Sequence, residues 1–197
     1  IYPMGSVIVI ENQQGQSFLK GHDNQVTSIA AALSGSILVT GQLPSLSSKL
    51  YESPVIIWDL KSRKQIKVLD GLHEGIKQVV ISHNGGFIAA SSKKNQLMVW
   101  SSKTLSPIFT KTYEKTLNIL SYDEDLIINV DKSLIELHFG NSNNPNQGNF
   151  TMPSTGLSRN YISCALFNPF GYLVGTDGGE ICIFEKNVFK AVSQVGK

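Results

Sequence analysis

Four histidines are the residues of this chain best suited to acid–base or metal chemistry: His22, His73, His83 and His138. A catalytic histidine needs a nucleophile or a carboxylate within reach, and a zinc site needs further His or Cys ligands at short spacing. His83 falls in a predicted turn and His138 ends a predicted strand, and neither has such neighbours in the sequence. His22 and His73 each stand ahead of a predicted repeat whose third strand closes with tryptophan, Trp58 or Trp100.

Two other segments resemble ligand-binding loops only superficially. Asp123-Glu124-Asp125 lacks the alternating oxygen ligands and the distal glutamate of a calcium loop, so it predicts a solvated turn. Gly175-Thr176-Asp177-Gly178-Gly179 is not followed by Lys-Ser or Lys-Thr and opens no helix, so it predicts a hairpin turn. Because no nucleophile, base and oxyanion donor come together, we expect a protein that is not an enzyme and has no cofactor, metal or small-molecule substrate.

Charge and hydropathy argue against two classes of partner. The 197 residues carry a net charge of +2, and the longest basic run is Lys61-Ser62-Arg63-Lys64, so we expect no nucleic-acid partner. No apolar run approaches the roughly 18 residues that a membrane span needs, so we expect no membrane partner. Cys164 and Cys182 fall in the first and third strands of one repeat, which predicts free thiols in a reducing compartment, the cytoplasm. Because the chain opens on Ile1, we expect a piece of a longer protein.

The elements that must position these residues repeat along the chain. A short strand phrase occurs four times, and its closing residues, Trp58, Trp100, Leu137 and Phe184, are separated by 42, 37 and 47 positions. Repeats of about 40–50 residues built from several short strands are typical of β-propeller blades. Each phrase follows a turn and a second apolar strand, and ahead of that turn lies a nearly continuous apolar run. These runs predict the innermost strands at Val26–Ala31, Ile76–Ile81, Leu117–Tyr122 and 162–167.

The outer strands are predicted from weaker, more polar segments, as suits the edge of a sheet. They fall at 65–69, 107–110, 150–152 and 187–195, while residues 6–19 supply the last two strands of a preceding blade. The Asn-rich segment 141–148 is interpreted as a solvated linker. We therefore predict an all-β, incomplete propeller of about four and a half blades. Residues 1–197 form part of one propeller, with the end of a preceding blade at 1–19 and blades at 20–70, 71–111, 112–152 and 160–197.

Two residue pairs give the propeller a resemblance to the WD40 family: Gly21-His22 before an inner strand, and Trp58-Asp59 at the close of the third strand. In that family a His, a Ser or Thr on the second strand, and the Trp form a buried hydrogen-bonded chain, because the indole and the imidazole both need partners when buried. The resemblance implies two such chains, His22–Thr40–Trp58 and His73–Ser91–Trp100. The aspartate that often completes the chain is absent, since Glu52 and Lys94 stand at the corresponding points.

Several phrases resemble one subfamily more closely, the cilia- and flagella-associated WD-repeat proteins of axonemal doublet microtubules. They are Ile1-Tyr2-Pro3-Met4-Gly5, Phe18-Leu19-Lys20-Gly21-His22 and Gly171-Tyr172-Leu173-Val174-Gly175-Thr176. The resemblance implies a non-enzymatic scaffold, a microtubule inner protein that binds tubulin and other axonemal proteins in the cytoskeleton of a cilium or flagellum. Gly41-Gln42 and Ile56-Ile57-Trp58-Asp59 are shared with EMAP-like proteins, so a cytoplasmic EMAP-like microtubule binder is an alternative. A generic WD40 adaptor, such as a ubiquitin-ligase substrate receptor, is another.

One connection exceeds what a blade requires. Residues 42–54 form a loop of 13 residues, whereas the matching connections at 92–96 and 177–179 have five and three. Long loops in compact domains are often functional. The candidate partner-binding residues are Leu46, Lys49, Leu50 and Tyr51 on this loop, with Lys93 and Lys94 nearby. Two interpretations stay open: the loop docks a partner on the rim of the propeller, or it folds back over its own blade.

Overall fold

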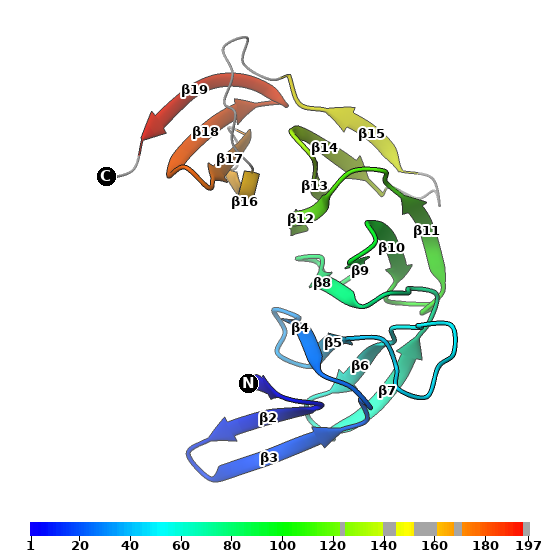
Figure 1. Cartoon of the computed structure of the whole chain (residues 1–197). Helices are drawn as coiled ribbons and strands as arrows, with labels where there is room; N and C mark the ends of the chain where they lie inside the picture. Colours follow the sequence, from blue (N-terminus) through cyan, green and yellow to red (C-terminus); the bar gives the residue numbers. More distant parts are fainter. Residues whose placement is uncertain (123–124, 140–144, 152–160, 168–170, 195–197) are drawn as a thin grey trace. The chain divides into compact units, whose positions relative to one another are not determined.

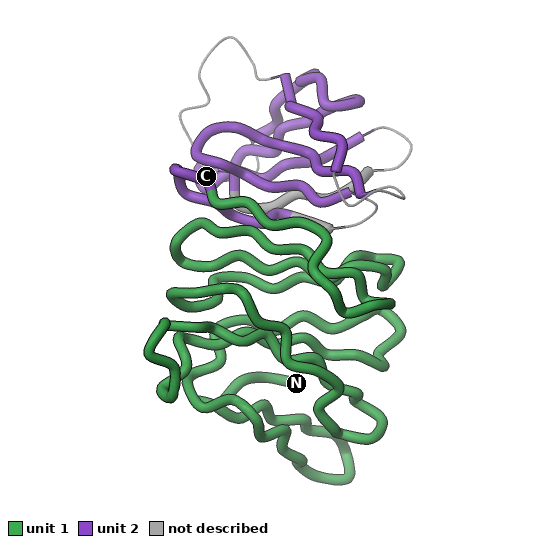
Figure 2. Tube along the Cα trace, turned by 90° about the vertical axis from the view of Figure 1, so that its right-hand side faces the viewer, with its two compact units in different colours: residues 1–112 green, residues 113–197 purple. Residues whose placement is uncertain are grey.

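The computed structural model describes residues 1–122, 125–139, 145–151, 161–167 and 171–194. All regular structure in these residues is β-strand. The chain divides into two compact units, Ile1–Thr112 and Tyr113–Lys197 (Figure 2). Every strand pairs antiparallel with its neighbour in sequence inside one sheet, so the all-β prediction is confirmed and each unit is built from successive meanders.

Unit 1 contains a three-stranded sheet and two four-stranded sheets that lie in succession (Figure 1). The first sheet is β1 (Tyr2–Met4), β2 (Val7–Asn12) and β3 (Gly15–Lys20). The second is β4 (Val26–Ala31), β5 (Ile37–Gln42), β6 (Val55–Asp59) and β7 (Lys64–Leu69). The third is β8 (Ile76–Ile81), β9 (Phe87–Ser92), β10 (Gln96–Ser101) and β11 (Pro107–Thr112). Their strand orders, β4 to β7 and β8 to β11, are those of two propeller blades.

The two four-stranded sheets of unit 1 pack face to face through an apolar cluster. Its buried members include Val39, Ile57 and Ile76, all at most 2% exposed. Side-chain hydroxyls of β4 also form hydrogen bonds with backbone groups of β8. Thr27 Oγ1 donates to the Ile76 carbonyl at 2.7 Å, and the Val79 N–H donates to Ser28 Oγ at 3.0 Å. Hydrophobic burial and directed hydrogen bonds therefore both fix the second blade against the first.

Hairpin turns set the strand registers in unit 1. In the β4–β5 turn the Ala32 N–H donates to the Ile37 carbonyl. In the β8–β9 turn the Ser82 N–H donates to the Phe87 carbonyl in the same way. Gly35 and Gly85 occupy equivalent places with φ of 65° and 69°, a conformation that costs glycine little. The turns at this end of the strands are thus short and similar, in contrast to the long 42–54 connection at the other end.

Unit 2 contains two four-stranded sheets. The first is β12 (Leu117–Tyr122), β13 (Leu126–Val130), β14 (Ser133–His138) and β15 (Asn146–Asn149). The second is β16 (Tyr161–Phe167), β17 (Gly171–Thr176), β18 (Glu180–Glu185) and β19 (Val188–Gln194). The Glu136 carboxylate on β14 joins them, since it accepts hydrogen bonds from Tyr172 Oη and Asn187 Nδ2, both at 2.5 Å. Phe150 packs beside this link, with its ring centroid 5.0 Å from that of Phe184.

Most predicted strands are confirmed, and three details are wrong. The predicted strand at 150–152 is instead β15 (Asn146–Asn149), so part of the segment interpreted as a linker pairs with β14. The first sheet has a third strand, β1 (Tyr2–Met4), beyond the two that were predicted. The outer strand predicted at 107–110 runs on to Thr112. The expectations for Asp123, Glu124 and residues 141–144 lie outside the described residues.

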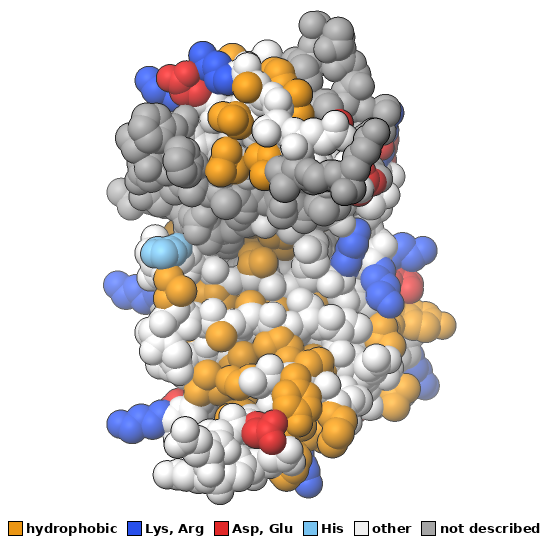
Figure 3. Space-filling view, turned by 90° about the vertical axis from the view of Figure 1, so that its left-hand side faces the viewer, with side chains coloured by type: hydrophobic (Ala, Val, Ile, Leu, Met, Phe, Trp, Pro, Cys, Tyr) orange, Lys and Arg blue, Asp and Glu red, His pale blue; other side chains and the backbone are white. Residues whose placement is uncertain are grey.

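Apolar side chains gather over one face of unit 1 in the space-filling view (Figure 3). The short strand β1 also carries exposed apolar side chains, since Tyr2 is 41% and Met4 59% exposed. Ile1 beside them is 52% exposed. A three-stranded blade with an exposed apolar edge differs in this respect from the four-stranded blades that follow it in the same unit.

Candidate functional site

The first of the two proposed hydrogen-bonded chains is formed in the blade β4–β7. Trp58 Nε1 donates to Thr40 Oγ1 at 2.8 Å, and Thr40 Oγ1 lies 2.6 Å from His22 Nε2. All three side chains are buried, with exposed fractions of 2%, 0% and 7%. Gly21 makes room for them, because a Cβ there would lie 2.8 Å from the indole Cη2 of Trp58. The Gly-His pair therefore fits the packing of the tryptophan ring as well as the hydrogen bonding.

The chain continues through two residues that the sequence did not point to, Gln42 and Asp23. His22 Nδ1 lies 2.6 Å from Gln42 Oε1, and Gln42 Nε2 donates to Asp23 Oδ1 at 2.6 Å. Since an amide oxygen only accepts, His22 Nδ1 carries the proton and His22 Nε2 accepts from the Thr40 hydroxyl. Every bond then donates in one direction, from Trp58 toward the Asp23 carboxylate.

The electrostatics of the chain agree with a neutral imidazole. Burial lowers the pKa of His22 below its ordinary 6.5, although the hydrogen bond to Gln42 and the charge of Asp23 oppose this shift. For Asp23, burial raises the pKa but the hydrogen bonds from Gln42, Ser45 and Ser47 outweigh it, and the pKa falls to about 2. The site therefore holds a neutral histidine and an ionised aspartate near pH 7, joined by an amide.

Acidification is expected to weaken this blade through His22. Its pKa is lower in the folded than in the unfolded state, so the stabilisation is complete above pH 6.5 and is lost as the pH falls below it. Lowering the pH from about 7.5 to 5.5 should lower the urea midpoint of the full-length protein. The His22→Gln variant should lose less on the same change, although it starts from lower stability.

The control for this titration is His73→Gln, which leaves the His22 chain intact and should keep the acid-dependent decrease of the wild type. Urea unfolding followed by circular dichroism at the two pH values measures both variants. Equal acid-dependent decreases in the wild type and His22→Gln would contradict the assignment of a buried, neutral His22.

The second implied chain, His73–Ser91–Trp100, is not formed, so that prediction is wrong. His73 Nδ1 lies 3.1 Å from the carbonyl of Leu50, and within the described residues Ser91 Oγ has no hydrogen-bond partner. His73 instead forms an isolated antiparallel bridge with Glu52, so the segment that carries it pairs with the 42–54 loop. Trp100 is still buried, at 1% exposed, so it serves packing rather than this chain.

The 42–54 loop is fastened at both ends. At its start, Asp23 Oδ2 accepts from Ser45 Oγ at 2.6 Å and from Ser47 Oγ at 3.3 Å. At its end, the Ser53 N–H donates to the Leu72 carbonyl at 2.8 Å. Ser53 Oγ accepts from the Gly75 N–H at 2.7 Å. The same Asp23 carboxylate that ends the buried chain therefore also holds the loop against the blade.

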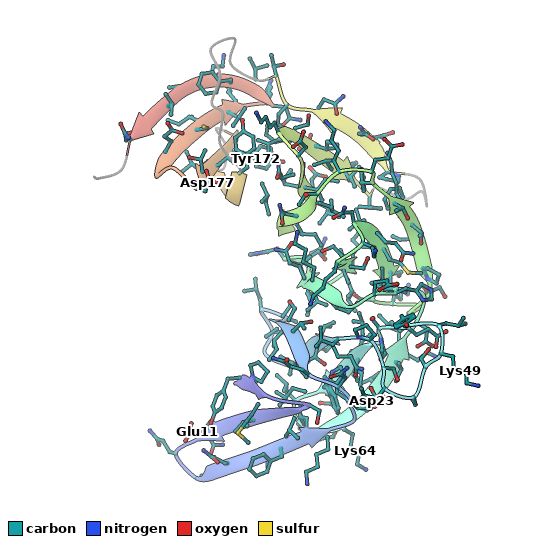
Figure 4. The ribbon with its side chains drawn as sticks, viewed as in Figure 1. Glu11, Asp23, Lys49, Lys64, Tyr172 and Asp177 are labelled. Atoms are coloured by element: carbon teal, nitrogen blue, oxygen red, sulfur yellow. The ribbon has the colours of Figure 1, made fainter. Side chains whose placement is uncertain are left out.

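Although its backbone is anchored, the loop presents apolar side chains to solvent. Leu46, Leu50 and Tyr51 are 78%, 69% and 60% exposed. Tyr51 has a φ of 55°, a left-handed conformation that is uncommon for an aromatic residue. Lys49 points away from the blade on the same loop (Figure 4). The loop backbone therefore folds back on its own blade, whereas its apolar side chains face outward, and docking of a partner on them stays a prediction.

The two neighbouring lysines differ in their relation to the loop. Lys93 lies at its base, because a Cβ on Gly75 would contact Lys93 Cδ and Pro44 Cδ, each at 3.4 Å. The Lys93 N–H also donates to the Gly75 carbonyl at 2.8 Å. Lys94 is exposed, and its N–H donates to Ser92 Oγ in its own hairpin. The structure therefore brings Lys93, more closely than Lys94, to the loop.

Other chemistry was sought in the residues that the structure describes. Among them no three His, Cys, Asp or Glu side chains are grouped to hold a metal ion. No helix of the described segments is long and apolar enough to cross a membrane. Cys182 is a buried free thiol, and burial, with the nearby Glu180 charge, raises its pKa.

Comparison with known proteins gives matches to one repeat family. The family described as "WD domain, G-beta repeat" matches residues 13–50 and 63–101. Cilia- and flagella-associated protein 52 of Homo sapiens is 31% identical over 106 residues, 51% of this chain and 16% of that protein. Its counterpart in Chlamydomonas reinhardtii is 32% identical over 106 residues, again 51% of this chain and 17% of that protein. The chain thus spans about a sixth of the length of these relatives.

Solved structures show the same fold at low identity. The β-propeller domain of Myceliophteria thermophila Cps50 (Swd1) superposes with a TM-score of 0.70 and 12% identity, covering 96% of this chain and 58% of that one. The Dos1 propeller superposes with a TM-score of 0.61 and 18% identity, covering 85% of this chain and 41% of that one. These likenesses confirm the β-propeller fold.

Proposed function

From a chain that carries WD40 repeats and folds as β-propeller blades, we propose a non-catalytic scaffold that binds other proteins in a cilium or flagellum. The names of the relatives, cilia- and flagella-associated protein 52, support the location. The fold supports the type of activity, because propellers of WD40 repeats typically serve protein interaction. In this proposal both units are parts of one propeller, and the chain has no cofactor.

The observation that carries the proposal is the anchored loop with outward apolar side chains. A loop held by its own blade loses little conformational entropy when a partner binds, so its contacts contribute more fully to affinity. Leu46, Leu50 and Tyr51 would supply the apolar centre of the contact, and aromatic residues such as Tyr51 are enriched at such centres. Lys49 and Lys93 would flank it.

At finer resolution, we propose that the partners are tubulin and neighbouring axonemal proteins, with the protein lodged inside doublet microtubules as an inner protein. The resemblance of its strand phrases to ciliary WD-repeat proteins supports this, as does the similarity to the human and algal relatives. A cytoplasmic EMAP-like microtubule binder or a soluble WD40 adaptor would share the fold but would leave axonemes at different extraction steps.

The test is fractionation of axonemes that carry the tagged full-length protein, first with detergent and then with high salt. The wild type should remain with the doublets after salt. The variant Leu46→Ser/Leu50→Ser/Tyr51→Asn should be retained at least about tenfold less, because it removes the apolar centre of the contact. Asparagine is chosen at position 51 because it tolerates a positive φ.

The matched control replaces three exposed apolar residues outside the loop: Leu33→Ser/Phe18→Ser/Val192→Ser, from side chains that are 72%, 48% and 49% exposed. This control should be retained like the wild type. Release of the wild type into detergent would contradict the ciliary scaffold and favour a soluble adaptor. Equal retention of the loop variant and the wild type would leave the scaffold intact but contradict docking through the loop.

A further inference from the structure

A second site lies in unit 1 at the opposite end of the strands from the 42–54 loop. It is a pocket of about 210 Å³ between the blades β4–β7 and β8–β11. Buried Ile57 and Ile88 lie at its base, each 2% exposed, and Ile66 on the outer strand β7 lines it at 48% exposed. The remaining lining residues are Ala32, Ser34, Ile37, Ile81, Gly85, Ser102 and Leu105.

The pocket has the size and surface of a side-chain receptor. A cavity of about 150 Å³ lined by leucine, isoleucine and phenylalanine accepts benzene in another protein, so this pocket can take one bulky aliphatic side chain. It also contains a polar group without a partner: within the described residues, the buried Ser102 Oγ makes no hydrogen bond. A buried hydroxyl that is unpaired favours any occupant that brings an acceptor to it, such as a peptide carbonyl.

The charges around this end of the strands are predominantly positive. The β6–β7 turn carries exposed Lys61, Arg63 and Lys64, and the β10–β11 turn carries exposed Lys103. These turns lie at the same end as the pocket, since the Leu60 N–H donates to the Ser36 carbonyl and the Ser102 N–H to the Gly86 carbonyl. Lys64 points away from the blade (Figure 4).

Two carboxylates at this end offset part of the positive charge, and an excess of basic groups remains. Asp59 precedes the β6–β7 turn, and its carboxylate accepts hydrogen bonds from the N–H groups of Lys61 and Ser62. Glu11, near the end of β2, accepts from Gln16 Nε2. An apolar pocket at the end of the strands where basic groups outnumber acidic ones is complementary to an apolar residue with acidic neighbours.

We propose that this inter-blade pocket binds an acidic segment of a partner protein, which inserts one aliphatic side chain between the two blades. The base of the pocket receives the side chain, Ser102 donates its hydroxyl proton to a carbonyl of the segment, and the basic turns attract its carboxylates. The site is separate from the 42–54 loop and does not depend on the ciliary role.

The test uses the full-length protein and fluorescein-labelled pentapeptides in low salt, followed by fluorescence anisotropy. Glu-Glu-Leu-Glu-Glu should bind at least about tenfold more tightly than Glu-Glu-Ala-Glu-Glu, because only leucine fills the pocket. It should also bind at least about tenfold more tightly than Lys-Lys-Leu-Lys-Lys, and added salt should weaken it. Ser102→Ala should weaken it about threefold without lowering the melting temperature.

Two variants with matched exposure locate the binding. Ile66→Glu places a negative charge at the pocket and should weaken the acidic leucine peptide at least about tenfold. Val192→Glu, at a side chain 49% exposed on the outer strand β19, should leave binding unchanged. Should Ile66→Glu fail to fold by circular dichroism, Ser34→Glu at an exposed lining residue replaces it.

Three outcomes would overturn the proposal. The first is no binding of the acidic leucine peptide up to millimolar concentration. The second is equal affinity for the leucine and alanine peptides, or for the acidic and basic ones, because either result removes the chemistry of the pocket or of its surroundings. The third is equal weakening by Ile66→Glu and Val192→Glu, which would indicate general repulsion rather than a site.

Discussion

Replacing Trp58 by alanine is expected to lower the free energy of unfolding by roughly 3–5 kcal/mol, the range measured for buried tryptophan. The side chain is 2% exposed and packs in the cluster that includes Ile8, Leu19 and Leu38. Its removal leaves a cavity between the sheet β1–β3 and the blade β4–β7 and takes a donor from Thr40 Oγ1. Urea unfolding of the full-length protein, followed by circular dichroism, measures the change.

A pair of milder variants separates packing from hydrogen bonding. Trp58→Phe keeps most of the ring but removes the indole N–H, and it should cost roughly 1–2 kcal/mol more than Trp100→Phe. Trp100 is equally buried, at 1% exposed, and stands in the blade where the chain of hydrogen bonds is absent. If Trp100→Phe cost as much as Trp58→Phe, the chain through Thr40 would contribute nothing beyond the packing of the ring.

The second large effect is expected at Gly171, the first residue of β17. Its φ is 127°, and a Cβ there would lie 2.0 Å from the Phe184 carbonyl oxygen and 3.0 Å from Glu185 Cα. Both contacts are backbone atoms of the paired strand, which cannot rotate away. We expect Gly171→Ala to cost roughly 3 kcal/mol or more, from an unfavourable conformation together with steric overlap. The measurement is the urea midpoint of the full-length protein.

Gly15 provides the matched control for this substitution. Its φ is 123°, nearly that of Gly171, but a Cβ there would meet nothing within 4 Å. Gly15→Ala therefore reports the conformational cost alone, which we expect at roughly 1–2 kcal/mol. A loss at Gly171 no larger than the loss at Gly15 would show that β17 and β18 separate easily, contrary to the close pairing described for them.

The strands that the sequence predicted well are those with strong local signals. Val26–Ala31 and Ile76–Ile81 are apolar runs followed by turns with glycine, and both were predicted with their observed bounds. The strands it missed have weak signals. β1 is three residues long with a central Pro3, and β15 has the polar sequence Asn-Gln-Gly-Asn. Pairing with β2 and β14 makes these segments strands, and such pairing cannot be recognised from composition.

The buried hydrogen bonds of the candidate site could be predicted from the sequence, whereas the carboxylate that ends the chain could not. His22, Thr40 and Trp58 belong to a repeated pattern, so their meeting could be expected. The family pattern places the carboxylate that ends the chain between the second and third strands, and in this sequence Glu52 stands there. It comes instead from Asp23, the residue after His22, by way of Gln42. Reaching that result requires knowing that β5 ends beside residue 23, which is tertiary information.

The failure at His73 has a different cause. The same residue types are present in the second blade, but the segment that carries His73 pairs with the long loop of the first blade. Gly71 and Gly75, on either side of His73, have φ of 106° and 91°, so the backbone there does not have the conformation of a strand. The long loop of one blade thus pairs with the segment that would supply the histidine of the next, an effect that repeat-by-repeat comparison cannot anticipate.

The Asp23 carboxylate, shared by the buried chain and the loop, has a thermodynamic consequence. A partner that binds only the anchored form of the loop also binds only the form in which Asp23, Gln42 and His22 are joined. By linkage, such a partner stabilises the whole blade against unfolding, by an amount that grows with its concentration relative to its Kd. Reciprocally, a substitution that breaks the hydrogen bonds near Trp58 makes the joined form less populated, and it must therefore weaken the affinity of the partner for the loop.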